Sequence, residues 1–215
     1  MLGAISSCTV TITGQSDQMP TSVKRRHQLG FAGCAIHYYS SRMRKRALIN
    51  WGEHDTLRAL NSVSHPVMEA DIFRITALYH TGGYYIDMKS GFQRGKTWHC
   101  LEKFNQKPWV TLTLGGFLSN WLMYSPAPRD KNIKVLLDKI VSDVLARVGV
   151  AGTNFEQKVW NLTGPQAVAR YLGNISTAPA EKMCCVYNPS GAAASWGAPN
   201  SYHHYPDTFS VYKSI

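Results

Sequence analysis

The most constraining feature of the sequence is the stretch from Pro66 to Asp87, which reads as a helix, a double-glycine stop and a short strand. Pro66 suits a first helical turn, and apolar residues then recur at helical spacing up to Gly82 and Gly83: Val67, Ile72, Ile75, Leu78 and Tyr79. The strand Tyr84–Ile86 follows at once, and Asp87 comes directly after it. A helix that leads into a strand is typical of α/β folds, so we expect Asp87 at the carboxyl end of a parallel strand.

Strands and helices alternate on both sides of this stretch. We expect strands at 8–13, 34–39 and 109–114, and helices at 21–29, 55–63, 133–148 and 164–172. The tail from Ala192 to Ile215 is rich in Gly, Ser, Pro and aromatic residues, and we expect it to form an ordered loop over a site. This order predicts an α/β domain with a largely parallel sheet, whose ligand lies outside the carboxyl ends of the strands.

The chain is basic, with a formal net charge of +10. Its first quarter holds two basic runs, Lys24–Arg26 and Arg42–Arg46. This balance favours an anionic partner such as a nucleoside diphosphate, a nucleic acid or an anionic surface. A charge run taken by itself is more often a solvated face of the protein.

The sequence also bears on the compartment. No apolar run reaches the roughly 18 residues that a membrane-spanning helix needs, and the first residues lack the charged region of a cleaved signal. The five cysteines are odd in number and include no C-x-x-C pair, so we expect neither a disulfide framework nor a zinc cage. These observations favour a soluble chain in a reducing compartment, the cytoplasm.

Asp71 and Arg74 are the charged residues of the expected 66–81 helix that stand out. They are three residues apart and therefore share a face, while Ile72, Ile75 and Leu78 point elsewhere. A carboxylate and a guanidinium can thus project together toward the strand end that carries Asp87. The simpler alternative is an ordinary surface ion pair.

The segment from Ala70 to Asp87 follows the pattern A-D-x-x-R-x-x-x-L-x-x-x-G-G-x-Y-x-D. It resembles the sugar-binding region of the DXD-containing glycosyltransferases, a group that includes initiating mannosyltransferases and capsular polysaccharide transferases. Three further segments are similar to that family in the same order: Asn120–Met123 before Pro126 and Pro128, Thr163–Pro165, and His203–Phe209. The resemblance covers about residues 66–209.

The resemblance implies a GT-A fold, which is a single Rossmann-like α/β domain, here over residues 1–215, with a mostly parallel central sheet flanked by helices. It implies that Asp71 and Arg74 hold the donor sugar or ribose, that Asp87 holds the ribose and a metal, and that His203 holds the diphosphate or metal. His204 is a further metal ligand by this resemblance. The other donor-binding residues that it implies are Thr11, Ile12 and Thr13 beside the base, together with Tyr85, Ile86, Met88, Lys89 and Asn120.

The sequence departs from the family at one position, because the D-x-D motif reads Asp87-Met88-Lys89 here. A protonated lysine cannot bind a cation. One alternative is that Asp87, a C-terminal histidine and the diphosphate still hold Mn²⁺ or Mg²⁺, ions that suit oxygen and imidazole ligands. The other is that Lys89 itself neutralises the leaving diphosphate. We expect the metal.

The expected activity is transfer of a hexose or deoxyhexose from a nucleoside diphosphate sugar, with UDP favoured, to a hydroxyl of a glycan or glycoprotein. The resemblance favours retention of configuration; an inverting enzyme would need a carboxylate base, for which Glu156 and Asp207 are candidates. Alanine at Arg74 or Asp87 should then abolish transfer without unfolding the chain. Two rival functions are a basic nucleic-acid-binding module and an inactive transferase fold that acts as a binding protein. We expect no nucleic-acid partner, and for a viral chain the place of action would be the host cytoplasm.

Overall fold

The computed structural model describes residues 8–88, 90–92, 110–114, 117–147, 159–171, 176–179 and 185–187. Each helix and strand expected from the sequence is present, with ends shifted by at most about two residues. The elements in chain order are β1 (Thr9–Thr13), α1 (Thr21–Gly30), β2 (Ala35–Tyr39), α2 (Ser41–Trp51), α3 (His54–Ser62), α4 (Pro66–Thr81), β3 (Gly83–Ile86), β4 (Ser90–Phe92), β5 (Val110–Leu114), β6 (Phe117–Ser125), α6 (Lys131–Arg147), the π-helix η1 (Val159–Thr163), α8 (Pro165–Tyr171), β7 (Ser176–Pro179) and β8 (Cys185–Tyr187).

Six strands form one sheet in the order β2-β1-β3-β6-β5-β7. β1 pairs in parallel with both β2 and β3, and β5 pairs in parallel with β7, whereas β6 is antiparallel to β3 and to β5. Five of the six strands therefore run in one direction and β6 runs in the other, so the expected mostly parallel sheet is confirmed. The short strands β4 and β8 pair separately in antiparallel fashion.

The chain reverses its direction of travel across the sheet at β1. From β1 it passes through α1 to β2 on one side, and then through α2, α3 and α4 to β3 on the other side of β1. In open α/β sheets a ligand binds at such a switch point, outside the carboxyl ends of the strands. For this chain the switch point lies between the residues that follow Thr13 and those that follow Ile86.

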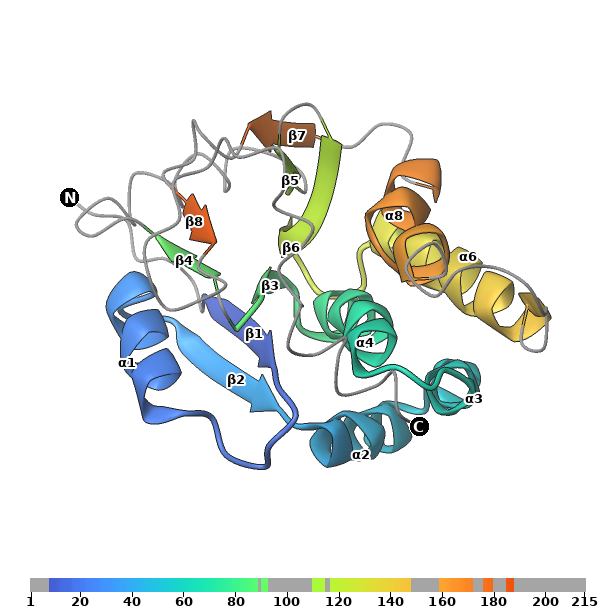
Figure 1. Ribbon diagram of the computed structural model, residues 1–215, viewed down its shortest axis with the longest axis horizontal. Helices are drawn as coiled ribbons and strands as arrows, with labels where there is room; N and C mark the ends of the chain where they lie inside the picture. The colour runs from blue at the N-terminus through green and yellow to red at the C-terminus, as the bar shows by residue number, and fades with distance from the viewer. Residues whose placement is uncertain are drawn as a thin grey trace, which may run out of the picture.

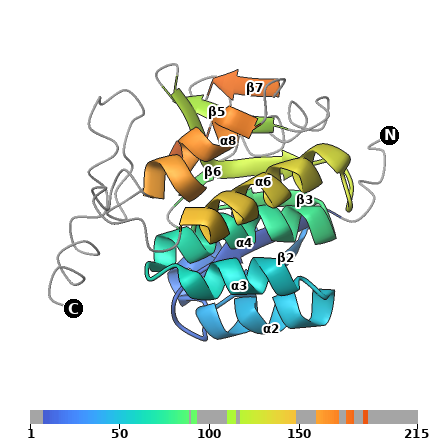
Figure 2. The ribbon, with the colours of Figure 1, turned by 90° about the vertical axis from the view of Figure 1, so that its right-hand side faces the viewer.

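Helices cover both faces of the sheet. α2, α3, α4, α6 and α8 form one layer along the same side (Figure 2), and α1 lies on the opposite side (Figure 1). Neighbouring residues of β3 point to opposite faces of the sheet. Tyr85 packs with α4 and α6, while Tyr84 packs with Phe31, which follows α1. The described residues therefore form a core cluster on each face of the sheet, and a third cluster lies among α2, α3 and α4.

α4 is the central helix of this layer, and its ends are set by local chemistry. His65 Nδ1 accepts a hydrogen bond of 3.2 Å from the backbone of Val67, and Pro66 occupies the first turn. The helix ends at Gly82, and Gly83 then has a φ of +74°. A Cβ atom on Gly83 would lie 2.3 Å from the Thr9 carbonyl oxygen, so glycine allows β3 to approach β1.

Six of the described elements were not expected from the sequence, namely α2, β4, β6, η1, β7 and β8. α2 contains the second basic run. At the start of this helix the Ser40 hydroxyl accepts a hydrogen bond of 3.2 Å from the Met43 backbone, and at its end Gly52 adopts the left-handed conformation. β6 contains the segment Asn120–Met123, for which the sequence predicted no strand. Its strand conformation matters for the site, because it carries Asn120.

The expectation of no disulfide is wrong, because Cys8 and Cys34 are joined. They precede β1 and β2, and the parallel pairing of these strands brings the two residues together. A disulfide is typical of an oxidising environment and counts against the expected reducing compartment. Among the residues that the structure describes, no helix is both long enough and apolar enough to span a membrane.

Candidate functional site

The ion pair expected between Asp71 and Arg74 forms inside the protein. Arg74 Nη2 lies 2.7 Å from Asp71 Oδ1, and the two side chains are 4% and 3% exposed. The alternative of a surface ion pair is therefore wrong in its placement, although the pairing itself is as the spacing indicates. An ion pair buried this deeply is stable only when further hydrogen bonds satisfy the remaining polar atoms.

Those hydrogen bonds come from two distant segments. The Asn120 side-chain amide donates to Asp71 Oδ1 at 3.1 Å, and the Thr163 hydroxyl donates to Asp71 Oδ2 at 3.0 Å. Arg74 Nη1 donates to the backbone oxygen of Asn120. Both oxygens of Asp71 thus have partners within the protein, and its predicted contact with the donor stays a prediction.

Asp87 extends this network toward the carboxyl ends of the strands. Its Oδ1 lies 3.4 Å from Arg74 Nη2 and accepts a hydrogen bond of 2.8 Å from the Tyr85 hydroxyl. That hydroxyl is also 2.9 Å from Thr13 Oγ1 on β1, and the Arg74 guanidinium lies 4.6 Å from the centre of the Tyr85 ring. At 17% exposure, the Asp87 side chain is the more accessible carboxylate of the network.

Burial also controls the protonation of these groups. It raises the pKa of Asp71 to about 6, an effect that the Arg74 charge opposes and the Asp87 charge reinforces, while Thr163 and Asn120 lower it by hydrogen bonding. Burial likewise raises the pKa of Tyr85 well above its ordinary value. At neutral pH Asp71 is therefore mostly ionised and Tyr85 keeps the proton that it donates to Asp87.

Of the remaining donor-binding residues expected from the sequence, some join the network around Asp71 and others lie in the core. Thr13 joins the network, whereas the side chains of Thr11, Ile12 and Ile86 are fully buried in the core. Met88 is half-buried and packs at the edge of the core cluster that contains Ile12 and Ile86. The structure thus brings together Thr13, Asp71, Arg74, Tyr85, Asp87 and Asn120.

Several predicted site residues lie outside the described residues. These are Lys89, Glu156, His203, His204 and Asp207. Within the described residues, no group of three or more His, Cys, Asp or Glu side chains could hold a metal ion. Of the expected metal ligands, the structure therefore places Asp87 alone, and Mn²⁺ or Mg²⁺ binding remains a prediction.

Thr163 is a site residue that the sequence reasoning did not assign. Its T-G-P motif was visible, but nothing in the sequence shows that it reaches Asp71, 92 residues earlier. It ends the π-helix η1, a rare form often found at functional sites. A Cβ atom on Gly164 would lie 2.8 Å from the Val159 carbonyl oxygen, so the motif's glycine permits this turn.

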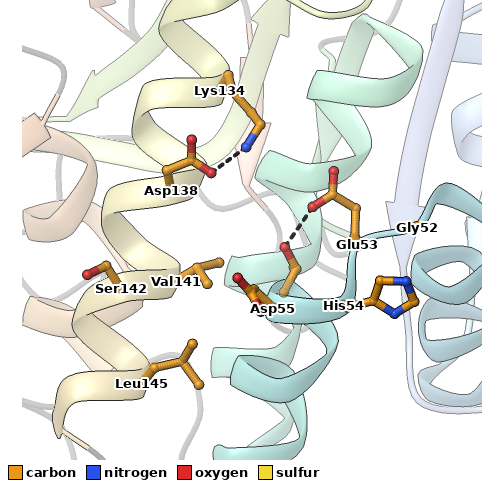
Figure 3. A pocket seen from close by; sticks show the side chains of 10 residues that line it. Gly52, Glu53, His54, Asp55, Lys134, Asp138, Val141, Ser142 and Leu145 are labelled. Atoms are coloured by element: carbon orange, nitrogen blue, oxygen red, sulfur yellow. Dashed lines mark hydrogen bonds and ion pairs between the residues drawn. The ribbon is translucent and has the colours of Figure 1, made fainter.

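A separate groove of about 640 Å³ lies between the start of α3 and α6 (Figure 3). Its wall includes Glu53, which accepts hydrogen bonds from Thr56 at 3.0 Å and from His80 at 2.8 Å. His80 is nine residues beyond Asp71 on α4, which is about 13 Å along the helix axis. None of the groove's lining residues belongs to the network around Asp71.

The chain has the fold of known glycosyltransferases. No protein-family model matches the sequence, and no curated protein matches it either. Among solved structures, PaToxG glycosyltransferase is similar with a TM-score of 0.50 and 15% identity, over 78% of this chain and 70% of that chain. The glycosyltransferase domain of the YGT toxin is similar at TM-scores of 0.44 when ligand-free and 0.43 when UDP-bound. These have 11% and 12% identity, and they cover 71% and 66% of this chain and 54% and 52% of theirs. At such identities the likeness concerns the fold alone.

Proposed function

We propose that this chain transfers a hexose or deoxyhexose from a nucleoside diphosphate sugar, UDP above all, to a hydroxyl of a glycan or glycoprotein with retention. The observation that carries the proposal is the meeting of Asp71, Arg74 and Asp87 with Asn120 and Thr163 beside the switch point of the sheet. PaToxG, whose fold this chain shares, is a glycosyltransferase.

The sequence motifs and the spatial arrangement are two separate supports. Asn120 and Thr163 lie 49 and 92 residues after Asp71, in two segments that resemble the DXD-containing family. A chance resemblance gives no reason for these segments to meet at one carboxylate. We therefore propose that the chain is a relative of that family and that residues 1–215 form one catalytic domain.

Charge and accessibility assign the roles. Arg74 is positive and lies between two carboxylates, so the three side chains together carry a net charge of −1 when all are ionised. A centre of this sign suits the hydroxyls of a sugar or ribose, since a carboxylate accepts the hydrogen bonds that they donate. Asp87 makes that contact, and Asp71 and Arg74 fix its position.

A negative centre does not by itself bind a diphosphate, so a cation is needed there. We propose Mn²⁺ or Mg²⁺, held by Asp87, His203 and His204; such an ion neutralises charge on the leaving diphosphate. The carboxylate fits a hard cation in charge, although the described residues supply only this ligand. Lys89 is the alternative source of positive charge.

The place of action that we propose is the cytoplasm, where the Cys8–Cys34 bridge would be reduced.

A thermal-shift panel of UDP- and GDP-hexoses, with and without Mn²⁺, tests the proposal. A ligand at 100 times its Kd stabilises the folded chain by about 2.7 kcal/mol, which for this length raises Tm by roughly 5–11 °C. Duplex and single-stranded nucleic acids serve as controls for the rival binding module. A shift with nucleic acid and none with any nucleotide sugar would refute the proposal, and a donor shift without turnover would indicate an inactive transferase fold.

A transfer assay with the donor that raises Tm most decides the cation. Transfer that stops with a chelator and returns with Mn²⁺ supports the metal. Transfer that is unaffected by a chelator assigns the charge to Lys89, and Lys89→Ala should then lose most of the activity.

A further inference from the structure

Arg44 differs from the other residues of its basic run. Arg42 and Arg46 are exposed on α2, whereas Arg44 is wholly buried. Its Nη2 pairs with Glu69 Oε2 on α4 at 2.9 Å, and its Nη1 donates to the backbone oxygen of Gly14 at 2.9 Å. The expectation that this run as a whole faces an anionic partner or solvent is therefore wrong for Arg44.

Burying a guanidinium is costly unless it is paired and hydrogen-bonded. Glu69 supplies the pairing, and it also accepts a hydrogen bond of 2.8 Å from the Ser41 hydroxyl at the start of α2. The Arg44 guanidinium thus reaches from α2 to α4 and to the chain after β1 at the same time. Of its contacts, the bond to Gly14 is made to a loop rather than to a helix.

That loop follows β1, one of the two strands at the switch point. The Gly14 amide donates to the Tyr39 carbonyl at 3.1 Å, and the Tyr38 hydroxyl donates to the Ser16 carbonyl at 2.7 Å. Ser40 donates to Asp17 at 2.6 Å. The loop is therefore fastened along residues 14–17, and Arg44 holds it from the buried side.

The start of the fastened loop lies close to Asp87. Thr13, which directly precedes Gly14, is hydrogen-bonded to Tyr85, and Tyr85 donates to Asp87. Residues 15–18 of the loop are exposed. A ligand whose hydroxyls reach Asp87 and which extends over β1 must therefore contact this loop.

We infer that Arg44 is a positioning residue for donor binding, which acts by holding the loop at residues 14–17 in the conformation that accepts the nucleotide. The inference rests on the proposed function. Arg44 does not touch the donor, so its loss should weaken binding and leave the chemical step nearly unchanged.

Arg44→Lys tests this, with Arg46→Lys as the matched control on the same helix. Lysine keeps the charge but cannot donate to Gly14 and Glu69 in the same fork geometry. The donor is whichever UDP- or GDP-hexose shifts the melting temperature most. We expect Arg44→Lys to raise its KM about tenfold with kcat within about twofold, and Arg46→Lys to change neither. Hydrogen exchange at the Gly14 amide, which donates to the Tyr39 carbonyl, should be faster in Arg44→Lys alone.

A folded Arg44→Lys with wild-type KM, or with a fall in kcat alone, would overturn the inference. If Arg44→Lys does not fold, Glu69→Gln weakens the same buried pair and takes the same two measurements. A wild-type chain that binds no nucleotide sugar refutes the proposed function. Unchanged exchange at the Gly14 amide refutes the hold of Arg44 on the loop, so the two failures are distinguishable.

Discussion

Replacing Arg74 with methionine should strongly destabilise the protein at neutral pH, because it leaves Asp71 buried without its counter-charge. The Asp71 side chain is 3% exposed and would keep only the hydrogen bonds from Asn120 and Thr163. Breaking a buried pair in this way costs about 3–5 kcal/mol, which for a chain of this length lowers Tm by roughly 6–20 °C. The cost should shrink at pH 5, since the pKa of Asp71 is about 6 in wild type and rises further when the Arg74 charge is lost, so that the carboxyl group is mostly neutral in both chains.

Urea unfolding at pH 5 and pH 8, followed by tryptophan fluorescence and circular dichroism, measures this cost. The control is Arg170→Met, which removes an ion pair of 3.1 Å with Asp143 from a side chain that is 39% exposed; it should cost at most about 1 kcal/mol. Asp71→Asn combined with Arg74→Met should be more stable than Arg74→Met alone, because no charge is left buried. An Arg74→Met variant within about 1 kcal/mol of wild type at pH 8 would refute the reasoning. The expectation from the sequence that Arg74 can be replaced without unfolding the chain would then stand.

Three further predictions concern the same network and the disulfide. The pKa of Asp71 is raised from 3.8 to about 6, so the folded chain binds this proton more tightly than the unfolded chain, and the free energy of unfolding should gain roughly 3 kcal/mol as pH falls from 6 to 4. Urea titrations should show this gain in wild type relative to Asp71→Asn, and equal pH slopes would contradict it. Thr163→Val should lower the free energy of unfolding by about 1.5–3 kcal/mol in the same assay, while Thr163→Ser should have nearly the stability of wild type. Cys8→Ser should lower the free energy of unfolding by roughly 3 kcal/mol, because the bridge to Cys34 spans 26 residues. A reductant should lower it equally in wild type and leave Cys8→Ser unchanged. A chain that unfolds in reductant cannot act in the cytoplasm.

The sequence predicts the central part of the fold well, because local signals agree there. Apolar residues at helical spacing, Pro66 and the two glycines set α4, and three β-branched or aromatic residues set β3. The spacing of Asp71 and Arg74 predicts that they meet. Their burial is not a property of α4 alone, because it depends on β6 and η1 packing over the middle of the helix.

Where the sequence reasoning failed, the deciding contacts lie far apart in the chain. In the sequence Arg44 resembles its exposed neighbours, and its burial depends on contacts with Glu69 and Gly14 on other elements. Cys8 and Cys34 are unremarkable in spacing and come together only because β1 and β2 pair in parallel. No local pattern encodes either meeting.

The central claim is that Asp87 contacts the donor of a glycosyl transfer, and turnover of a UDP-hexose by wild type and Asp87→Asn tests it most directly. Asparagine keeps the shape of the side chain but removes the charge, and a half-buried position at the end of β3 should tolerate the change without unfolding. We predict that wild type releases UDP and transfers or hydrolyses the sugar, and that Asp87→Asn lowers kcat/KM by at least about 100-fold. Turnover by a folded Asp87→Asn at the wild-type rate would contradict the account.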